Sequence, residues 1–162
     1  MLERYVVLDL EMTGLNPKRD KILEIGAARV ENGKLVQQYE TFVNPGIKIP
    51  EVVRKLTGIT DEMVKEAPRT EEILEDFIGF CREDILVGHN VIFDYSFLKQ
   101  AAVNQKMEFE CEAVDTLKLC RKLMPEQEKK NLGNACTYYQ IEQPLAHRAE
   151  ADALSAHFLY QK

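Results

Sequence analysis

Several features are missing from this chain, and each absence argues against a class of protein. No apolar run approaches the ~20 residues of a membrane-spanning helix, and the first residues, MLERYVV, lack the basic, apolar and small-residue order of a secretion signal. The sequence therefore predicts a cytoplasmic protein without a membrane anchor. No GxxxxGK[ST] loop is present either, which argues against a nucleotidase that transfers phosphate.

Cysteine pairs with metal-binding spacing are also missing. The four cysteines lie far apart without a CxxC pair, and only three histidines are present to complete a zinc set. Free thiols are the expected state. We assign no catalytic role to Cys81 and Cys120, because they lie in helix-like segments where a small hydrophobic residue would serve equally well.

An excess of positive charge is the third missing feature. The net charge of −6 argues against a protein that coats nucleic acid with a broad basic surface. Binding at a local metal site stays compatible with this charge. Four carboxylates at such a site would leave −2 (−6 + 4) for the remainder, and two divalent cations would offset those four charges.

Repeats, low-complexity tracts and linkers are absent, so residues 1–162 are expected to form a single domain. Asn32-Gly33 is a strong hairpin signal between two strands, which predicts an antiparallel pair. The strands and helices together predict an α/β fold with a mixed five-stranded sheet, antiparallel in its first three strands and flanked by helices. Strands are expected at 5–10, on either side of the 31–34 turn, at 84–90 and ending at 115; helices are expected from 51, at 70–81 with Thr70 as N-cap, at 91–105, after 115, at 132–139 and at 148–160.

The stretch YVVLDLEMTGLNP, residues 5–17, places two acids in or beside a buried strand. Asp9 and Glu11 are two residues apart, so their side chains emerge on the same face near the carboxyl end of the strand. Two neighbouring carboxylates repel one another, and burying them is unfavourable unless a positive charge lies between them. The alternative is that the strand frays here and both acids are solvated.

A second acid with apolar neighbours occurs in GHNVIFDYSFL. On a helix, Asp94 shares a face with Phe97 and Leu98, which is the face expected to pack into the core. The alternative is a rotated helix in which Asp94 is a cap or pairs with Lys99. His89 follows the apolar strand, at the end where open α/β sheets place ligands, and is either a ligand or a plain strand-end residue.

The third case is QPLAHRAEADALSAH near the C-terminus. Asp152 shares a helix face with Ala149 and Ala156, a small-residue face suited to close packing. His147 lies about 140° from Asp152 around such a helix, so the two cannot share a face. If Pro144 keeps the preceding stretch irregular, His147 lies in a mobile loop above the site; the alternative is an exposed, idle histidine.

Four acids thus occur where ordinary cores avoid them: Asp9, Glu11, Asp94 and Asp152. Hard oxygen ligands suit magnesium or manganese rather than zinc, and a pair of such cations is a standard arrangement for cutting phosphodiesters. The joint interpretation is a two-cation site.

Three of these segments resemble the motifs of a known family. DLEMTGL, GHNVIFDYSFL and HRAEAD are similar to the three exonuclease motifs of the DEDDh 3′→5′ exonucleases, the group that includes the proofreading epsilon subunit of bacterial DNA polymerase III. ILEIGAARV, LTGIT and VDTLKLCRKLMP resemble the connecting segments in the same order, so the resemblance covers nearly the whole chain. One departure is Met12-Thr13, where the epsilon subunit has two threonines. Another is the chain end soon after the last helix, so a polymerase-binding tail is not expected.

The resemblance implies a ribonuclease H-like fold and a two-metal hydrolysis with Mg²⁺ or Mn²⁺. Asp9, Glu11 and Asp152 would bind one cation, Asp9 would bridge to the second, and Asp94 would hold that second ion mainly through water. His147 would be the general base, and the product a nucleoside 5′-monophosphate. Residues expected to hold the terminal nucleotide are Met12, Thr13, Gly14, Thr57, Asn90 and Phe93.

The expected activity is 3′→5′ removal of nucleotides from single-stranded or frayed DNA ends in proofreading or repair, with a polymerase as a possible associate. An exoribonuclease of the same fold is an alternative, because no residue in the sequence can be assigned to recognise the 2′-hydroxyl of RNA. A catalytically inactive module that only binds nucleic-acid ends is the other alternative. The complete five-residue set argues against it.

Overall fold

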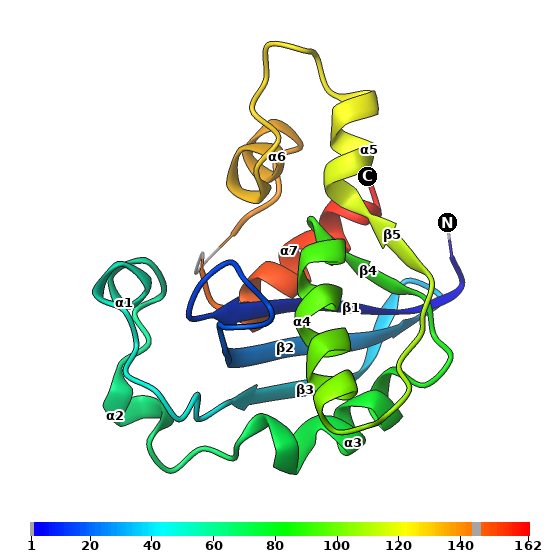
Figure 1. Ribbon diagram of the computed structural model, residues 1–162. Helices are drawn as coiled ribbons and strands as arrows, with labels where there is room; N and C mark the ends of the chain where they lie inside the picture. Colours follow the sequence, from blue (N-terminus) through cyan, green and yellow to red (C-terminus); the bar gives the residue numbers. More distant parts are fainter. Residues whose placement is uncertain (1, 144–146) are drawn as a thin grey trace.

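The computed structural model describes residues 2–143 and 147–162 and contains one five-stranded sheet in the order β3-β2-β1-β4-β5 (Figure 1). β1 (Arg4–Met12), β2 (Ile22–Glu31) and β3 (Lys34–Phe42) form an antiparallel meander. β4 (Leu86–Gly88) runs parallel to β1, and β5 (Ala113–Asp115) runs parallel to β4. The predicted mixed sheet and the hairpin at Asn32-Gly33 are confirmed.

Helices cover both faces of this sheet. Even-numbered residues of β1, such as Leu8 and Leu10, pack with apolar side chains of α3 and α4, whereas Tyr5 and Val7 pack with Ala153 and Ala156 of α7. The period-2 alternation of β1 therefore decides which helix each side chain meets. The helices are α1 (Glu51–Thr57), α2 (Asp61–Val64), α3 (Thr70–Cys81), α4 (Val91–Asn104), α5 (Thr116–Leu123), α6 (Leu132–Tyr138) and α7 (Ala149–Tyr160).

Two local predictions differ from the structure. Thr70 is the first helical residue of α3 rather than its N-cap; Arg69 is the N-cap, and its N–H donates to Glu72 over 2.7 Å. The Glu72 carboxylate thus accepts the N–H of the N-cap residue, as the third helical residue does in a capping box. The short helix α2 was not predicted; it forms because the Thr60 side chain accepts the N–H of Met63.

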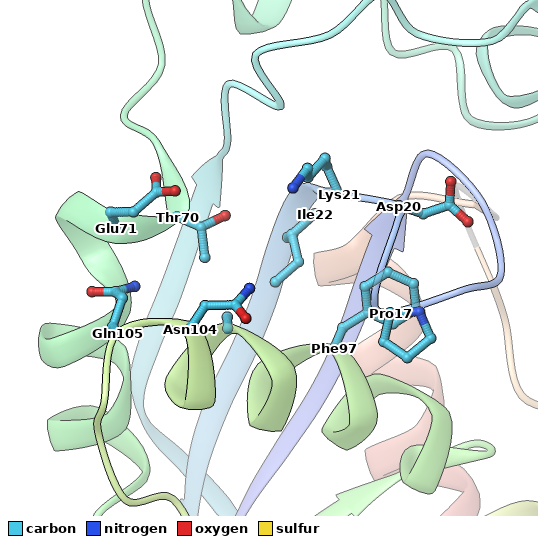
Figure 2. A pocket seen from close by; sticks show the side chains of 10 residues that line it. Pro17, Asp20, Lys21, Ile22, Thr70, Glu71, Phe97, Asn104 and Gln105 are labelled. Carbon is cyan, nitrogen blue, oxygen red and sulfur yellow. The ribbon is translucent and has the colours of Figure 1, made fainter.

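A small hollow of about 130 Å³ lies where the segment between β1 and β2 meets the start of α3 and the end of α4 (Figure 2). Charges of both signs line it: Asp20, Lys21 and Glu71. Asp20 also accepts the N–H of Asn16 over 2.8 Å, so its carboxylate closes the turn in this segment. We assign no chemistry to this hollow.

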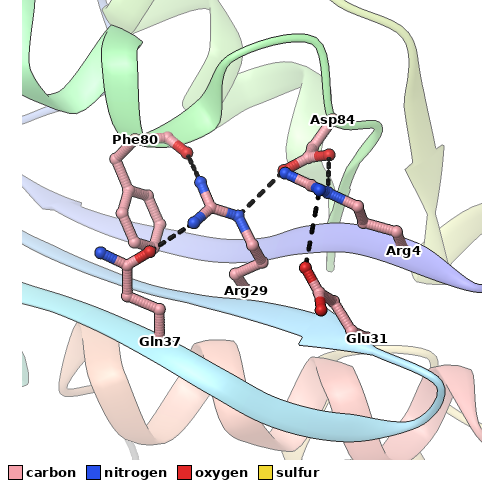
Figure 3. A network of polar contacts seen from close by, with 6 residues as sticks. All are labelled: Arg4, Arg29, Glu31, Gln37, Phe80 and Asp84. Atoms are coloured by element: carbon pink, nitrogen blue, oxygen red, sulfur yellow. Dashed lines mark hydrogen bonds and ion pairs between the residues drawn. The ribbon is translucent and has the colours of Figure 1, made fainter.

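A polar network, buried at Arg29 and exposed at Arg4 and Gln37, lies at the opposite end of the sheet (Figure 3). Arg29 of β2 pairs with Asp84 (Nε–Oδ2 3.1 Å) and also donates to the carbonyl of Phe80 and to Gln37. Arg4 reaches the same carboxylate over 2.6 Å. The network joins the end of α3 to the amino end of β1, while the acids Asp9 and Glu11 lie toward the carboxyl end of that strand.

The four cysteines are free thiols, as predicted. Within residues 2–143 and 147–162, no helix is long and apolar enough to cross a membrane.

Candidate active site

Asp9 and Glu11 lie on the face of β1 that α7 covers. β1 continues in regular pairing with β2 through Glu11, so the strand does not fray at the acids. Their cross-strand partners in β2 are Gly26 for Asp9 and Glu24 for Glu11. Since paired residues share a face, all four positions point toward the start of α7.

Gly26 sets how closely α7 approaches the sheet. A Cβ atom at this position would lie 2.2 Å from the backbone nitrogen of Glu150 and 2.3 Å from the carbonyl carbon of Ala149. No side chain larger than hydrogen fits without moving the helix. Because Gly26 is paired with Asp9, this contact brings the first turn of α7, which contains Asp152, next to Asp9.

Asp152 is buried and held by two donors. Gln143 donates from Nε2 to Oδ1 over 2.7 Å, and the backbone N–H of His147 donates to Oδ2 over 3.0 Å. His147 itself lies just before α7, exposed and with a left-handed backbone (φ 62°). It therefore lies in the loop before the helix, where the sequence predicted it; Pro144 lies outside the described residues.

Asp94 lies in the first turn of α4 and is only 4% exposed. Its Oδ1 accepts the N–H of Leu10 over 3.1 Å, which places it against the backbone between Asp9 and Glu11. Neither alternative role holds. The N-cap of α4 is Asn90, and Lys99 pairs with Glu110 instead.

The electrostatics of these acids favour a bound cation. Burial, followed by the charges of Asp94, Glu11 and Asp152, raises the pKa of Asp9 well above its ordinary value. Burial and the charge of Asp152 raise the pKa of Glu11 to about 8. The pKa of Asp94 is also raised, mainly by burial. A positive ion among them would relieve both the repulsion and the desolvation.

The donor atoms present also fit a divalent cation. One ligand atom each from Glu11, His147 and Asp152 lie within 4.8 Å of one another. Two carboxylates from two elements, with an imidazole beside them, can hold a divalent cation.

The acids and His147 border one cavity of about 420 Å³. The residues predicted to bind metal, act in catalysis or hold the terminal nucleotide all line it: Asp9, Glu11, Met12, Thr13, Gly14, Thr57, Asn90, Phe93, Asp94, His147 and Asp152. Some of these side chains also have structural partners. The Thr13 hydroxyl accepts the N–H of Lys21, and the Thr57 hydroxyl donates to the Val53 carbonyl.

Sequence reasoning missed Glu24 and Arg148. Glu24 is 1% exposed and accepts 2.7 Å and 3.1 Å bonds from the Arg148 guanidinium and a 3.2 Å bond from the N–H of Ala149. It thus fixes the start of α7. The signal was available, because Glu24 interrupts an apolar strand in the same way as Asp9.

An apolar rim on the cavity was also missed. Leu15, Val52 and Leu56 line it, although they are 81%, 74% and 57% exposed. Exposed apolar side chains gathered at a cavity are typical of a binding surface.

His89 has a different environment from the acids. Its Nδ1 is 3.0 Å from the Thr116 hydroxyl and its Nε2 is 2.7 Å from the Lys130 carbonyl. Both ring nitrogens are engaged, so His89 joins the wall of the cavity to α5 and to the segment after it.

Comparison with known proteins gives one family. The family described as "Exonuclease" (RNase_T) matches residues 6–160. The chain belongs to this exonuclease family. The DNA polymerase III PolC-type of Caldanaerobacter subterraneus is 42% identical over 149 residues, which are 92% of this chain and 11% of that protein. The Bacillus subtilis PolC-type polymerase is 37% identical, covering 99% of this chain and 11% of that protein.

Solved exonuclease structures share the fold. Escherichia coli exonuclease I in complex with a dT13 oligonucleotide superimposes with a TM-score of 0.84 at 17% identity, covering 99% of this chain and 40% of the other. Exonuclease X in complex with 5′-overhanging duplex DNA gives a TM-score of 0.73 at 25% identity, with 97% and 89% covered. The predicted ribonuclease H-like fold and family are confirmed. This chain spans about a tenth of the length of the PolC-type polymerases that it matches.

Proposed function

We propose that this exonuclease-family chain hydrolyses DNA from the 3′ end and releases nucleoside 5′-monophosphates, using two divalent cations, Mg²⁺ or Mn²⁺. One observation carries the proposal. Asp9, Glu11, Asp94 and Asp152 come from β1, α4 and α7 and converge on one cavity, with His147 at its edge. We further propose that residues 1–162 act as a single exonuclease domain.

The proposed roles follow from position. Asp9, Glu11 and Asp152 would hold one cation, and Asp9 together with Asp94 would hold the second. Bound cations supply Lewis-acid stabilisation of the charge that develops on the phosphoryl and leaving oxygens. His147 would take the proton from the attacking water, because an imidazole positioned beside the site can act as a general base. Its exposed loop position lets the ring approach after the substrate binds.

The cavity rim suits the terminal nucleotide. Leu15, Val52 and Leu56 offer apolar surface to a base, and Phe93 offers an aromatic face. Met12, Thr13 and Gly14 present backbone beside the sugar, and Thr57 and Asn90 complete the wall. A single-stranded or frayed end can enter such a cavity more readily than a paired one, because its last base is already free.

PolC-type polymerases as relatives support a role in proofreading or repair, with a polymerase as the associated protein. The free thiols fit the reducing cytoplasm, which is the compartment that we propose.

The test is a cleavage ladder. Single-stranded DNA labelled at its 5′ end is incubated with the protein and Mg²⁺ or Mn²⁺, with EDTA as the metal-free control. A ladder that shortens one nucleotide at a time supports 3′→5′ hydrolysis, whereas immediate release of the labelled mononucleotide means the opposite polarity. Matched RNA and duplex DNA run in parallel. Faster cutting of RNA would favour the exoribonuclease alternative, and no cutting of any substrate would favour an inactive end-binding module.

A further inference from the structure

A basic segment stands out in this acidic chain. Residues 116–130, which comprise α5 and the turn after it, contain five basic and two acidic side chains, a net charge of +3. The rest of the chain therefore carries −9 (−6 − 3). The buried residues Thr116 and Cys120 face inward, whereas the basic side chains Lys118, Arg121, Lys122 and Lys129 are exposed.

The basic segment has a defined structure, because hydrogen bonds close the turn after α5. The Lys130 ammonium donates to the carbonyls of Pro125 (2.6 Å) and Glu126 (2.9 Å) and also contacts that of Glu128, so it closes the turn after α5. Lys130 is therefore occupied within the protein, and four basic side chains are left facing solvent.

This surface is attached to the wall of the active-site cavity. His89 lines that cavity and is bonded to Thr116, the first residue of α5, and to the Lys130 carbonyl. Asp115, directly before α5, accepts the N–H of Asn90, which lines the cavity too. The basic segment is thus joined to the cavity wall at both of its ends.

The residues that line the cavity differ in polarity. Leu15, Val52 and Leu56 are exposed apolar side chains that suit bases, while His89 and Asn90 are polar. A nucleic-acid strand presents bases on one edge and phosphates on the other. When its bases pack on the apolar side chains, its phosphates are left to the polar residues, and His89 and Asn90 are bonded to α5 and its flanking residues.

We propose that Lys118, Arg121, Lys122 and Lys129 bind the phosphodiester backbone of the single strand upstream of the 3′-terminal nucleotide. This proposal rests on the proposed function, because it takes the strand end to lie in the cavity. It explains how a chain of net charge −6 retains a polyanion: the binding charge is concentrated in one segment beside the site.

The test is equilibrium binding, which does not depend on cleavage. Fluorescein-labelled dT20 and dT4 are titrated in Mg²⁺ against an Asp9→Asn chain and against the same chain carrying Lys118→Gln, Arg121→Gln and Lys122→Gln. We expect the triple variant to weaken dT20 binding by up to about 100-fold at 0.1 M salt and to reduce the slope of log K against log salt by about 2, because each lost single-strand phosphate contact removes about 0.7. Binding of dT4, which is too short to span the segment, should change much less.

A charge-matched control carries Lys34→Gln, Lys48→Gln and Lys65→Gln, which are exposed positions on β3, before α1 and after α2. It should bind dT20 as the parent does. Equal weakening by both triple variants would mean that only net charge matters, and unchanged dT20 binding in the α5 variant would also overturn the proposal. Thermal unfolding of each variant confirms that it is folded. Failure of the cleavage ladder would contradict the proposed function, while this binding comparison would still decide the α5 surface.

Discussion

Asp9 is crowded by other acids: burial, followed by the charges of Asp94, Glu11 and Asp152, raises its pKa. Asp9→Asn should lower cleavage by at least about 10³-fold, because it removes a carboxylate proposed to face both cations. The same change removes a repelling charge, so the metal-free variant should unfold at the same temperature or a few degrees higher. Turnover of labelled DNA and thermal unfolding measure the two effects.

Asp76→Asn is the matched control, because Asp76 is an exposed acid on α3. It should change neither quantity. If Asp9→Asn keeps its activity but loses stability, Asp9 is a structural residue.

His147 should affect rate rather than binding. A positioned general base contributes roughly 10²- to 10⁴-fold, so His147→Ala should lose about that much turnover while it retains strand affinity. The pH dependence of turnover should change as well, because the group proposed to accept the proton is absent. Turnover across pH at saturating Mg²⁺ measures both effects. A variant that keeps the turnover and the pH profile of the parent would assign the proton to another group.

At the scale of elements, the contact between β2 and α7 positions the site. Gly26→Ala would place a methyl group 2.2 Å from the Glu150 nitrogen, and backbone cannot yield as a flexible side chain does. We expect a loss of about 2 kcal/mol or more in unfolding free energy. Metal affinity should also weaken, because Asp152 moves with the helix. Urea unfolding and Mn²⁺ titration measure the two effects.

Gly79 in α3 offers the control. A Cβ atom there would meet nothing within 4 Å. Gly79→Ala should therefore be neutral or stabilise the chain by up to about 1 kcal/mol, since alanine favours helix. Equal effects of the two substitutions would mean that the close approach at Gly26 is unimportant.

The contact between Gly26 and α7 shows which parts of the site can be predicted from a sequence. Asp9, Asp94 and Asp152 were found from local periodicity, because each interrupts an apolar face that repeats every two residues or every three to four. The role of Gly26 depends on its register opposite Asp9 and on a helix more than 120 residues later in the chain. No local sequence pattern indicates a contact between residues so far apart in the chain.

The exposure of the apolar rim could not be predicted from the sequence either. Leu15, Val52 and Leu56 read as ordinary hydrophobic residues, and only the packing of α1 near the end of β1 shows that they are left uncovered at the cavity. The elements themselves were predictable since capping, turn and alternation signals agreed. The exceptions were helix α2 and the Arg69 cap. In both, a hydrogen bond between a side chain and a backbone N–H three residues away fixes the start of the helix.

At the scale of the whole molecule, crowded acids link stability to pH and metal. The folded pKa of Glu11, about 8, lies above its ordinary value of 4.5, so the folded state holds the proton more tightly than the unfolded state. The contribution of Glu11 to the stability of the metal-free protein should therefore be greatest below pH 4.5. It should fall as the pH rises to about 8. The expected loss is a few kcal/mol. Asp9, Asp94 and Asp152 act in the same direction, because their pKa values are raised too.

Thermal unfolding at pH 5.5, 7 and 8.5, with EDTA or with Mg²⁺, measures this linkage. Mg²⁺ should stabilise the protein most at pH 8.5, where the carboxylates are charged. Glu11→Gln should flatten the metal-free profile. Metal-free stability that rises from pH 5.5 to 8.5 would contradict the proposed crowding of charge.

The most direct test of the metal site is anomalous diffraction from crystals of the protein grown with Mn²⁺. One or two peaks are expected among the carboxylates of Asp9, Glu11, Asp94 and Asp152, with Mn–O distances of about 2.1 Å and, if two ions bind, about 4 Å between them. Manganese bound elsewhere but absent from these four carboxylates, or carboxylates spread too far apart for such a pair to bridge, would contradict the site.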